Sequence, residues 1–305
     1  MGERTVFFGT SDFAAIVLRV LAVSPYRPQL VVTPPDRRRG RGRKLSPPPA
    51  AIVAKGAGIE LLQAEDLNEI ATLDRIRAEG PDVGVVCAFG QLIREPLLSQ
   101  PEMLNIHPSL LPRWRGAAPI ERAIMSGDTE TGVTIMRLAE GLDSGPIALQ
   151  ERTTIEPGED FASLSGRLAE IGAVLMLRAL ELHERGELEL ADQDDGQATY
   201  AEKISAGDRR LDPTRPAVEL ERAVRALTPH VGAYLELEGG DRLGVREARV
   251  GEGALPAGAL EPAGGELLLG CGEGVLALGS VQPPGGRPMP AEAYLRGHDV
   301  PRRAL

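Results

Sequence analysis

The chain has 305 residues, more than a single hydrophobic core usually organises, so we expect two domains. Hydrophobic residues make up 42% and charged residues 26%, which are the proportions of a globular protein rather than a disordered or fibrous one. The net charge of −10 excludes a protein that coats nucleic acid through its overall charge. Any contact with nucleic acid must therefore be local.

The two cysteines, Cys87 and Cys271, lie far apart and form no CxxC or Cys/His cluster. We therefore expect neither a disulfide framework nor a metal site. The N-terminus lacks a basic segment followed by an apolar stretch of signal length, and no apolar run of about 18 residues occurs. These features lead us to expect a cytoplasmic protein.

Strand-like and helix-like segments alternate along the first half of the chain. Short apolar runs predict strands, and apolar residues three or four apart predict helices. The predicted strands are 5–8, 30–32, 59–61, 83–86, 103–106, 133–138 and 147–153, and the predicted helices are 13–21, 50–56, 67–78, 91–98 and 117–126. Such alternation is typical of an α/β fold, here a Rossmann-like domain with a mostly parallel sheet covered on both faces.

A long amphipathic helix, 160–185, closes this first domain, which we place at 1–188. Residues 189–206 are assigned to a linker and 207–305 to a smaller second domain. There, a helix at 217–227 precedes short strand candidates separated by Gly and Pro turns, at 233–237, 243–250, 267–271 and 275–281. Short strands at this spacing favour a small β-barrel.

Asn105 and His107 are the first candidate functional pair. Side chains alternate along a strand, so residues at i and i+2 project from the same face, and Pro108 ends the strand directly afterwards. Ligands of open α/β sheets bind at the carboxyl ends of the strands, where this pair lies. Taken alone, Asn105 could instead cap a loop, and His107 could be a hydrogen-bonded core histidine.

The stretch 109–120 decides between these interpretations. Its sequence is Ser-Leu-Leu-Pro-Arg-Trp-Arg-Gly-Ala-Ala-Pro-Ile, and a Gly-Leu-Asp-Ser-Gly turn follows at 141–145. An Asn-x-His pair with this loop and this turn resembles the signature of the folate-dependent formyltransferases, and the Arg-Trp-Arg-Gly-Ala-Ala-Pro form is similar to that of the methionyl-tRNA formyltransferase family. The resemblance implies that Asn105, His107 and Asp143 are catalytic. Alone, Asp143 would be a turn residue between glycines.

Formyl transfer has simple chemical requirements that these residues can meet. An amine attacks the formyl carbon, an oxyanion develops, and a proton moves from the amine to the leaving folate nitrogen. Asn105 can donate its amide N–H to the oxyanion, an effect worth about 10²–10³-fold in rate. His107 can shuttle the proton, worth about 10²–10⁴-fold, because histidine titrates near neutral pH. Asp143 can orient the imidazole and stabilise its charged form.

The resemblance also implies a folate site. Ser109, Leu110, Leu111 and Pro112 would form a loop whose backbone groups hydrogen-bond the pterin ring. The helix-like stretch 91–98 would help to wall the same pocket. The co-substrate implied is 10-formyltetrahydrofolate, with no metal.

A dense positive run lies early in the chain, between Pro34-Pro35 and Pro47-Pro48-Pro49. Such runs are often solvated and mobile. This one interrupts a compact αβ unit, where connections are normally only a few residues long, so its length favours a function. Its side chains could bind acceptor-stem phosphates and order on binding, and the resemblance implies a basic loop for the tRNA acceptor arm here. The predicted tRNA-binding residues are Arg37, Arg38, Arg39, Arg41, Arg43 and Lys44.

The second domain resembles the OB-like, tRNA-binding domain of the family. The segments that carry this resemblance are 200–204, 225–229, 232–234 and 282–297. One departure is visible: His230-Val231 stands where the family commonly has a Trp-Pro pair. This departure puts the local packing around His230 in question, but it does not affect the predicted catalytic residues.

The resemblance therefore implies transfer of the formyl group of 10-formyltetrahydrofolate to the free amino group of initiator methionyl-tRNA, by a protein that we expect to be a monomer. A formyltransferase acting on another amine, such as an amino sugar nucleotide or a purine precursor, would use the same three residues. A non-catalytic RNA-binding protein would depend on the basic run and the OB-like domain, and would keep its activity after His107→Ala. The basic run and the second domain favour tRNA over a small amine.

Overall fold

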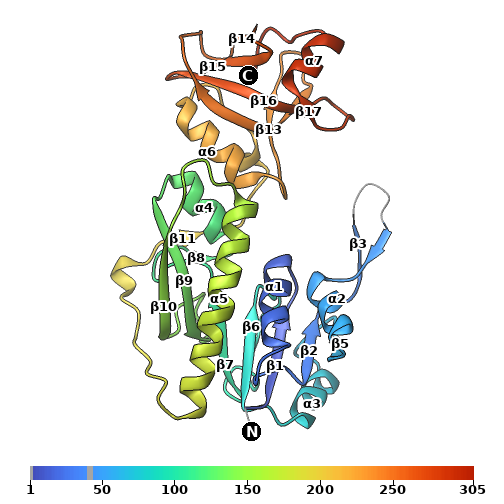
Figure 1. Cartoon of the computed structure of the whole chain (residues 1–305), viewed down its shortest axis with the longest axis vertical. Coiled ribbons are helices and arrows are strands. Elements are labelled where there is room, and N and C mark those ends of the chain that lie inside the picture. The colour runs from blue at the N-terminus through green and yellow to red at the C-terminus, as the bar shows by residue number, and fades with distance from the viewer. Residues whose placement is uncertain (1–2, 40–43) are drawn as a thin grey trace. The chain divides into compact units, whose positions relative to one another are not determined.

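The structure is a computed structural model that describes residues 3–39 and 44–305 (Figure 1). The chain divides into two compact units. Unit 1 comprises Met1–Gly116, Thr131–Thr153 and Ser165–Tyr200, and unit 2 comprises Ala117–Glu130, Thr154–Leu164 and Ala201–Leu305. Unit 2 therefore includes two segments, 117–130 and 154–164, that are separated in sequence from its main part. The division of the chain at 188 and 206 stays a prediction.

Unit 1 is built on a seven-stranded sheet of order β10-β9-β7-β6-β1-β2-β5 (Figure 1). Its strands are β1 (Thr5–Gly9), β2 (Leu30–Thr33), β5 (Glu60–Gln63), β6 (Val83–Cys87), β7 (Glu102–His107), β9 (Glu130–Arg137) and β10 (Ile147–Thr154). The five strands from β7 to β5 pair in parallel, and β9 runs antiparallel to β7. The mostly parallel sheet predicted from the sequence is confirmed.

Helices cover both faces of this sheet, and its central strands are therefore buried along their whole length. On one face, α3 (Ile70–Ala78) and the segment 89–97 pack over apolar side chains of β1, β2 and β6. On the other face lie α1 (Asp12–Leu21), α2 (Pro49–Gly56) and α5 (Phe161–Glu184) (Figure 1). Gly172 of α5 approaches Ile106 of β7 so closely that a Cβ atom would lie 2.8 Å from its Cγ2.

The helix predicted at 91–98 is wrong, because residues 95–99 form turns instead. Pro96 lies inside the stretch and has no N–H for a helical hydrogen bond. Gln91 ties the stretch to the preceding loop: its Oε1 accepts from the N–H of Leu67 at 2.9 Å, and its Nε2 donates to the carbonyl of Ala64 at 3.0 Å. The segment therefore packs as an irregular loop at the carboxyl end of β6.

The ends of the basic run pair with each other. β3 (Arg37–Arg39) and β4 (Lys44–Ser46) form an antiparallel two-stranded sheet in which Arg38 is opposite Leu45. Arg41 and Arg43 lie outside the described residues. We call 37–46 the basic hairpin.

Unit 2 contains an antiparallel sheet of order β12-β13-β16-β15-β14, with β17 paired to β16. Its strands are β12 (Ala233–Glu236), β13 (Arg242–Gly251), β14 (Leu260–Ala263), β15 (Glu266–Gly270), β16 (Val275–Gln282) and β17 (Met289–Pro290). Its helices are α4 (Pro119–Ser126), α6 (Ala217–Leu227) and α7 (Ala291–Gly297). Sequence reasoning missed β14, β17 and α7, which are short; each of the two strands contains a Pro, and α7 ends in Gly.

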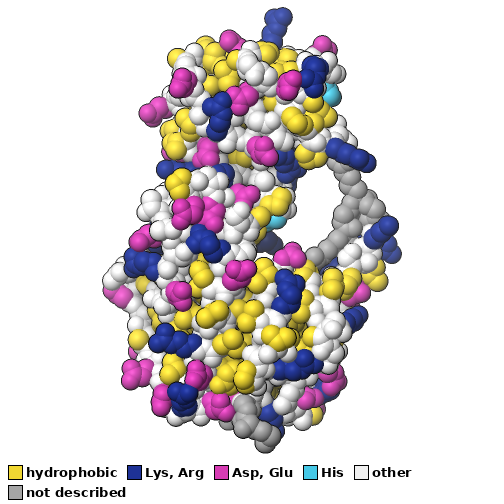
Figure 2. All heavy atoms as spheres, viewed as in Figure 1, with side chains coloured by type: hydrophobic (Ala, Val, Ile, Leu, Met, Phe, Trp, Pro, Cys, Tyr) yellow, Lys and Arg dark blue, Asp and Glu magenta, His cyan; other side chains and the backbone are white. Residues whose placement is uncertain are grey.

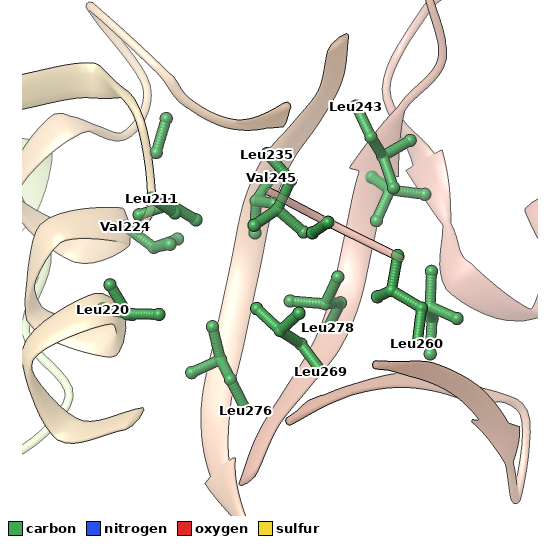
Figure 3. Packing of buried hydrophobic residues seen from close by; sticks show 14 of the residues in the cluster. Leu211, Leu220, Val224, Leu235, Leu243, Val245, Leu260, Leu269, Leu276 and Leu278 are labelled. Carbon is green, nitrogen blue, oxygen red and sulfur yellow. The ribbon is translucent and has the colours of Figure 1, made fainter. Parts of the chain in front are cut away.

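The core of unit 2 lies between α6 and this sheet. Figure 3 shows Leu220 and Val224 of α6 pointing toward the sheet, where Leu276 and Val245 are fully buried. The last residues of the chain join the two edge strands: the N–H of Leu305 donates to Glu236 at the end of β12, and the N–H of Leu260 in β14 donates to Arg302. The sheet thereby approaches the barrel predicted from the sequence.

In the part of the chain that the structure describes, none of the helices combines the length and the apolar character needed to cross a membrane.

Candidate active site

Asn105 and His107 lie side by side at the carboxyl end of β7. Val86 of β6 is in register with Asn105, so both candidate side chains share the sheet face that α3 covers, while Ile106 points to α5. Asn105 is 8% exposed and His107 is 4% exposed. The alternation predicted from the sequence therefore holds, and the pair is enclosed.

Two groups approach the two nitrogens of the His107 imidazole. Nε2 is 2.8 Å from the carbonyl oxygen of Trp114, and Nδ1 is 3.7 Å from Oδ2 of Asp143. A carbonyl oxygen can only accept, so Nε2 carries a hydrogen in this contact. In the neutral ring Nδ1 is therefore the nitrogen without a hydrogen, and it faces the carboxylate of Asp143.

Asp143 is held by its own turn and by the opposite loop. Its φ of +45° is in the left-handed region, which an aspartate adopts at a cost. Its Oδ2 accepts from the backbone N–H of Gly116 at 2.8 Å. Gly145 is required where the turn returns to β9, because a Cβ atom there would lie 1.9 Å from the carbonyl oxygen of Arg137. These contacts aim the carboxylate at His107.

The loop at 109–112 is fixed by hydrogen bonds within the protein. Thr134 Oγ1 donates to the carbonyl of Ser109 at 2.7 Å and accepts from the N–H of Leu111 at 3.2 Å. Gln150 Nε2 donates to the carbonyl of Leu111 at 2.8 Å, and the carbonyl of Leu110 accepts from the N–H of Arg113 at 3.0 Å. Much of the backbone that was predicted to meet the pterin ring is thus engaged internally. The loop forms a rigid wall, and its contact with folate stays a prediction.

Sequence reasoning missed the segment 191–199, which was assigned to the linker. Gln193 contacts the Asp143 turn, and Thr199 accepts from the N–H of Trp114 at 2.9 Å. Buried Arg115, 3% exposed, lies beneath both. The segment has no strand or helix periodicity, so no sequence signal at this level could have placed it against the site.

Comparison with known proteins matches both parts of the chain. Residues 3–180 match the family profile described as "Formyl transferase", and residues 203–299 match "Formyl transferase, C-terminal domain". The "Methionyl-tRNA formyltransferase" of Halorhodospira halophila is 44% identical over 87% of this chain and 93% of its own length. That of Parvibaculum lavamentivorans is 41% identical over 96% of both chains. The chain belongs to the methionyl-tRNA formyltransferase family.

A solved structure shares the fold of this formyltransferase. HypX from Aquifex aeolicus, in complex with tetrahydrofolic acid, superposes with a TM-score of 0.67 at 18% sequence identity. The match covers 97% of this chain but spans only 47% of HypX.

The basic hairpin of this formyltransferase presents exposed cationic side chains. Arg37, Arg38 and Lys44 are all exposed, while Asp36 just before them accepts from Nε2 of Gln63 at 2.8 Å and anchors the base of the hairpin. Figure 2 shows Lys and Arg interspersed with Asp and Glu over the face drawn. A local basic element in an acidic protein fits the expectation that any nucleic-acid contact is local.

His230, the departure from the family pattern, is exposed but contacts two side chains within unit 2. Its ring stacks on Phe161 with ring centroids 3.7 Å apart, and its Nε2 is 2.9 Å from Oε1 of Glu121 in α4. The stacking supplies an aromatic contact in the absence of the usual Trp. The substitution is therefore accommodated locally.

The cysteines do not take part in the site. Burial raises the pKa of the Cys87 thiol far above its ordinary value, and burial likewise raises the pKa of Cys271 to about 11. Both thiols are therefore protonated and inert at neutral pH. Among residues 3–39 and 44–305, no group of three or more His, Cys, Asp and Glu side chains could hold a metal ion.

Proposed function

We propose that this enzyme transfers the formyl group of 10-formyltetrahydrofolate to the amino group of initiator methionyl-tRNA, with Asn105, His107 and Asp143 as the catalytic residues. The observation that carries the acceptor assignment is the 44% identity with a methionyl-tRNA formyltransferase along 87% of the chain. The chemistry is supported by the enclosed His107, which faces the Asp143 carboxylate at 3.7 Å.

The proposed reaction begins with attack of the methionyl amine on the formyl carbon. The Asn105 amide N–H stabilises the oxyanion that develops on the formyl oxygen. Nδ1 of His107 accepts the proton that the amine loses, and the Asp143 carboxylate stabilises the resulting imidazolium. When the bond from the formyl carbon to the folate nitrogen breaks, the proton passes to that nitrogen, so tetrahydrofolate leaves neutral at this position and His107 returns to its starting state.

The Trp114 carbonyl has a part in this scheme. Its oxygen lies 2.8 Å from Nε2 and accepts the hydrogen bond from it, and so leaves Nδ1 as the exchanging nitrogen. It also keeps the imidazole from rotating between steps. A ring fixed in this way needs no reorganisation when the charge appears, which is how preorganised sites lower a barrier.

The folate site is proposed to lie against the loops that end β6 and β7. The loop formed by Ser109, Leu110, Leu111 and Pro112 gives a rigid wall, and Leu92 in the neighbouring segment is 64% exposed and offers apolar surface. A pterin ring needs such a combination of flat apolar surface and a few fixed polar groups.

The basic hairpin is proposed to bind phosphates of the tRNA acceptor arm, through Arg37, Arg38, Arg39, Arg41, Arg43 and Lys44. Replacing Arg41, Arg43 and Lys44 with Gln should raise KM for methionyl-tRNA and lessen its salt dependence, by up to about 0.9 in the log–log slope for each phosphate that the variant no longer neutralises. A control that replaces Arg77, which is half-exposed and paired with Asp74, should leave both unchanged. A fall in turnover on a small amine alone would instead place the hairpin in the active centre.

The proposal is tested by a formylation assay with 10-formyltetrahydrofolate and a choice of acceptors. Initiator methionyl-tRNA should be formylated, and amino sugar nucleotides and purine precursors should not. Transfer only to the small amines would overturn the tRNA assignment. Full biological activity of His107→Ala would overturn the enzymatic role in favour of RNA binding. We also propose that the enzyme acts in the cytoplasm and as a monomer, as a translation enzyme of this kind would.

A further inference from the structure

Gln193 reaches from the segment 191–199 to the turn that carries Asp143. Its Nε2 donates to the carbonyl oxygen of Asp143 at 2.8 Å and to that of Gly145 at 2.7 Å. Its Oε1 accepts from Nε of Arg115 at 3.0 Å. Both polar atoms of this amide are therefore hydrogen-bonded: the nitrogen donates to the turn, and the oxygen accepts from the buried guanidinium of Arg115.

Arg115 is a fixed support for this amide. Its side chain is 4% exposed, and its Nη2 donates to Oδ1 of Asp195 at 2.7 Å, which comes from the same segment as Gln193. Just before Gln193, Ala191 exchanges two backbone hydrogen bonds with Ile147 at the start of β10, at 2.8 and 2.9 Å. The segment is thus anchored on both sides of the glutamine.

The far end of the segment is bonded to the loop that holds His107. Thr199 Oγ1 accepts from the N–H of Trp114 at 2.9 Å, and the backbone of Thr199 bonds to Pro112 and Arg115 at 3.2 and 2.8 Å. The carbonyl of Trp114 in turn bonds Nε2 of His107. One stretch of chain therefore contacts the supports of both catalytic side chains.

We propose that Gln193 is a positioning residue for the formyl transfer reaction, which sets the distance between the Asp143 carboxylate and His107. This inference rests on the proposed catalytic role of Asp143. Gln193 touches neither the imidazole nor the carboxylate: it acts on the backbone carbonyls of the turn. On this view Gln193 supports the catalytic side chains from a segment that was assigned to the linker.

The geometry of the turn explains why it needs such a support. Asp143 holds a left-handed φ of +45°, a conformation that persists only when its surroundings impose it. Within the part of the chain that the structure describes, its carboxylate accepts from one backbone donor, the N–H of Gly116 at 2.8 Å. Loss of the two Gln193 donors frees the carbonyls of Asp143 and Gly145, and relaxation of the turn moves the carboxylate away from Nδ1 of His107. A misplacement of about 1 Å can cost about 10²-fold in rate.

Two substitutions separate this role from a structural one. Gln193→Glu keeps an oxygen for Arg115 and removes both donors to the turn, whereas Gln193→Met removes both ends of the amide. We expect each to lower kcat for methionyl-tRNA by about 10- to 100-fold, with KM for the formyl donor and for tRNA within about twofold of the wild type. Gln197→Met is the matched control: Gln197 is exposed in the same segment and bonds only Asp194 among the described residues, so kcat should not change.

A double-mutant cycle with Asp143→Asn tests the route of the effect. If Gln193 acts through Asp143, adding Gln193→Glu to Asp143→Asn should lower kcat by less than about threefold. A full additional loss in that background, or a wild-type kcat for Gln193→Glu alone, would overturn the inference and leave the proposed function intact. A wild-type kcat for Asp143→Asn would remove Asp143 from the proposed mechanism and overturn the inference with it, since Gln193 would then have no catalytic carboxylate to position.

Discussion

Asp143→Asn removes one charge from the site with little change in shape. The substituted side chain keeps an oxygen that can accept from the N–H of Gly116, which bonds the carboxylate at 2.8 Å. What it loses is the negative charge 3.7 Å from Nδ1 of His107. The effect on turnover therefore measures how much this charge stabilises the imidazolium that forms when the amine gives up its proton.

The distance sets the size of the effect. Two unit charges 3.7 Å apart attract each other by about 4.5 kcal/mol at an effective dielectric constant of about 20, and by about 1.1 kcal/mol in bulk water. The side chains of His107 and Asp143 are 5% and 16% exposed, so the value lies between these limits and well above the value in water, at about 2–4 kcal/mol. At about 1.4 kcal/mol for each factor of ten, kcat should fall by about 30- to 1000-fold.

The assay is initial-rate formylation of methionyl-tRNA at saturating 10-formyltetrahydrofolate, with KM measured for both substrates. KM for the formyl donor should stay within about threefold, because the lost interaction forms only as charge develops. Asp192→Asn is the control, since Asp192 is exposed and the substitution changes the net charge equally. A kcat within about threefold of the wild type would remove Asp143 from the mechanism. A rise in KM with unchanged kcat would make it a substrate-binding residue instead.

Two further predictions concern stability and pH, with opposite signs. Burial lowers the pKa of His183, but hydrogen bonds to Glu3 and Glu102 outweigh this effect and raise its pKa overall. Protonated His183 therefore stabilises the folded protein fully below about pH 6.5, and this stabilisation is lost as pH rises through the folded-state pKa. His183→Asn should therefore lower the free energy of unfolding more at about pH 6 than at about pH 9, as measured by urea denaturation, and a larger deficit at the higher pH would refute this. The hydrogen bond from Arg122 holds the pKa of Asp208 well below its ordinary value, so that stabilisation is present above about pH 4 and is lost as pH falls. Asp208→Asn should lower the free energy of unfolding by about 1.5–3 kcal/mol near neutral pH and by progressively less in acid. A decrease that is constant with pH would contradict a lowered pKa of Asp208.

The sequence by itself determined most strands and helices of the parallel sheet and the placement of two of the three candidate catalytic residues, Asn105 and His107. Apolar runs and helical spacing predicted the strands and helices of the parallel sheet, because burial on both faces leaves a local signature in each strand. The period of two along a strand placed Asn105 and His107 on one face at the carboxyl end of β7. Family resemblance added Asp143, whose own neighbours show only a turn between glycines. The functional roles of all three residues stay predictions.

Only the tertiary structure decided how these residues meet. Asp143 reaches His107 because the turn after β9 folds back against the loop that contains Gly116, and no local pattern encodes that return. The stretch 91–98 has helical spacing, but Pro96 interrupts it, and Gln91 at its start bonds Leu67 and Ala64 in the loop after β5. Gln193 lies in a segment without periodicity, and its position depends entirely on hydrogen bonds to backbone groups distant in sequence. Local periodicity records burial of a single element, whereas contacts between elements depend on the path of the whole chain.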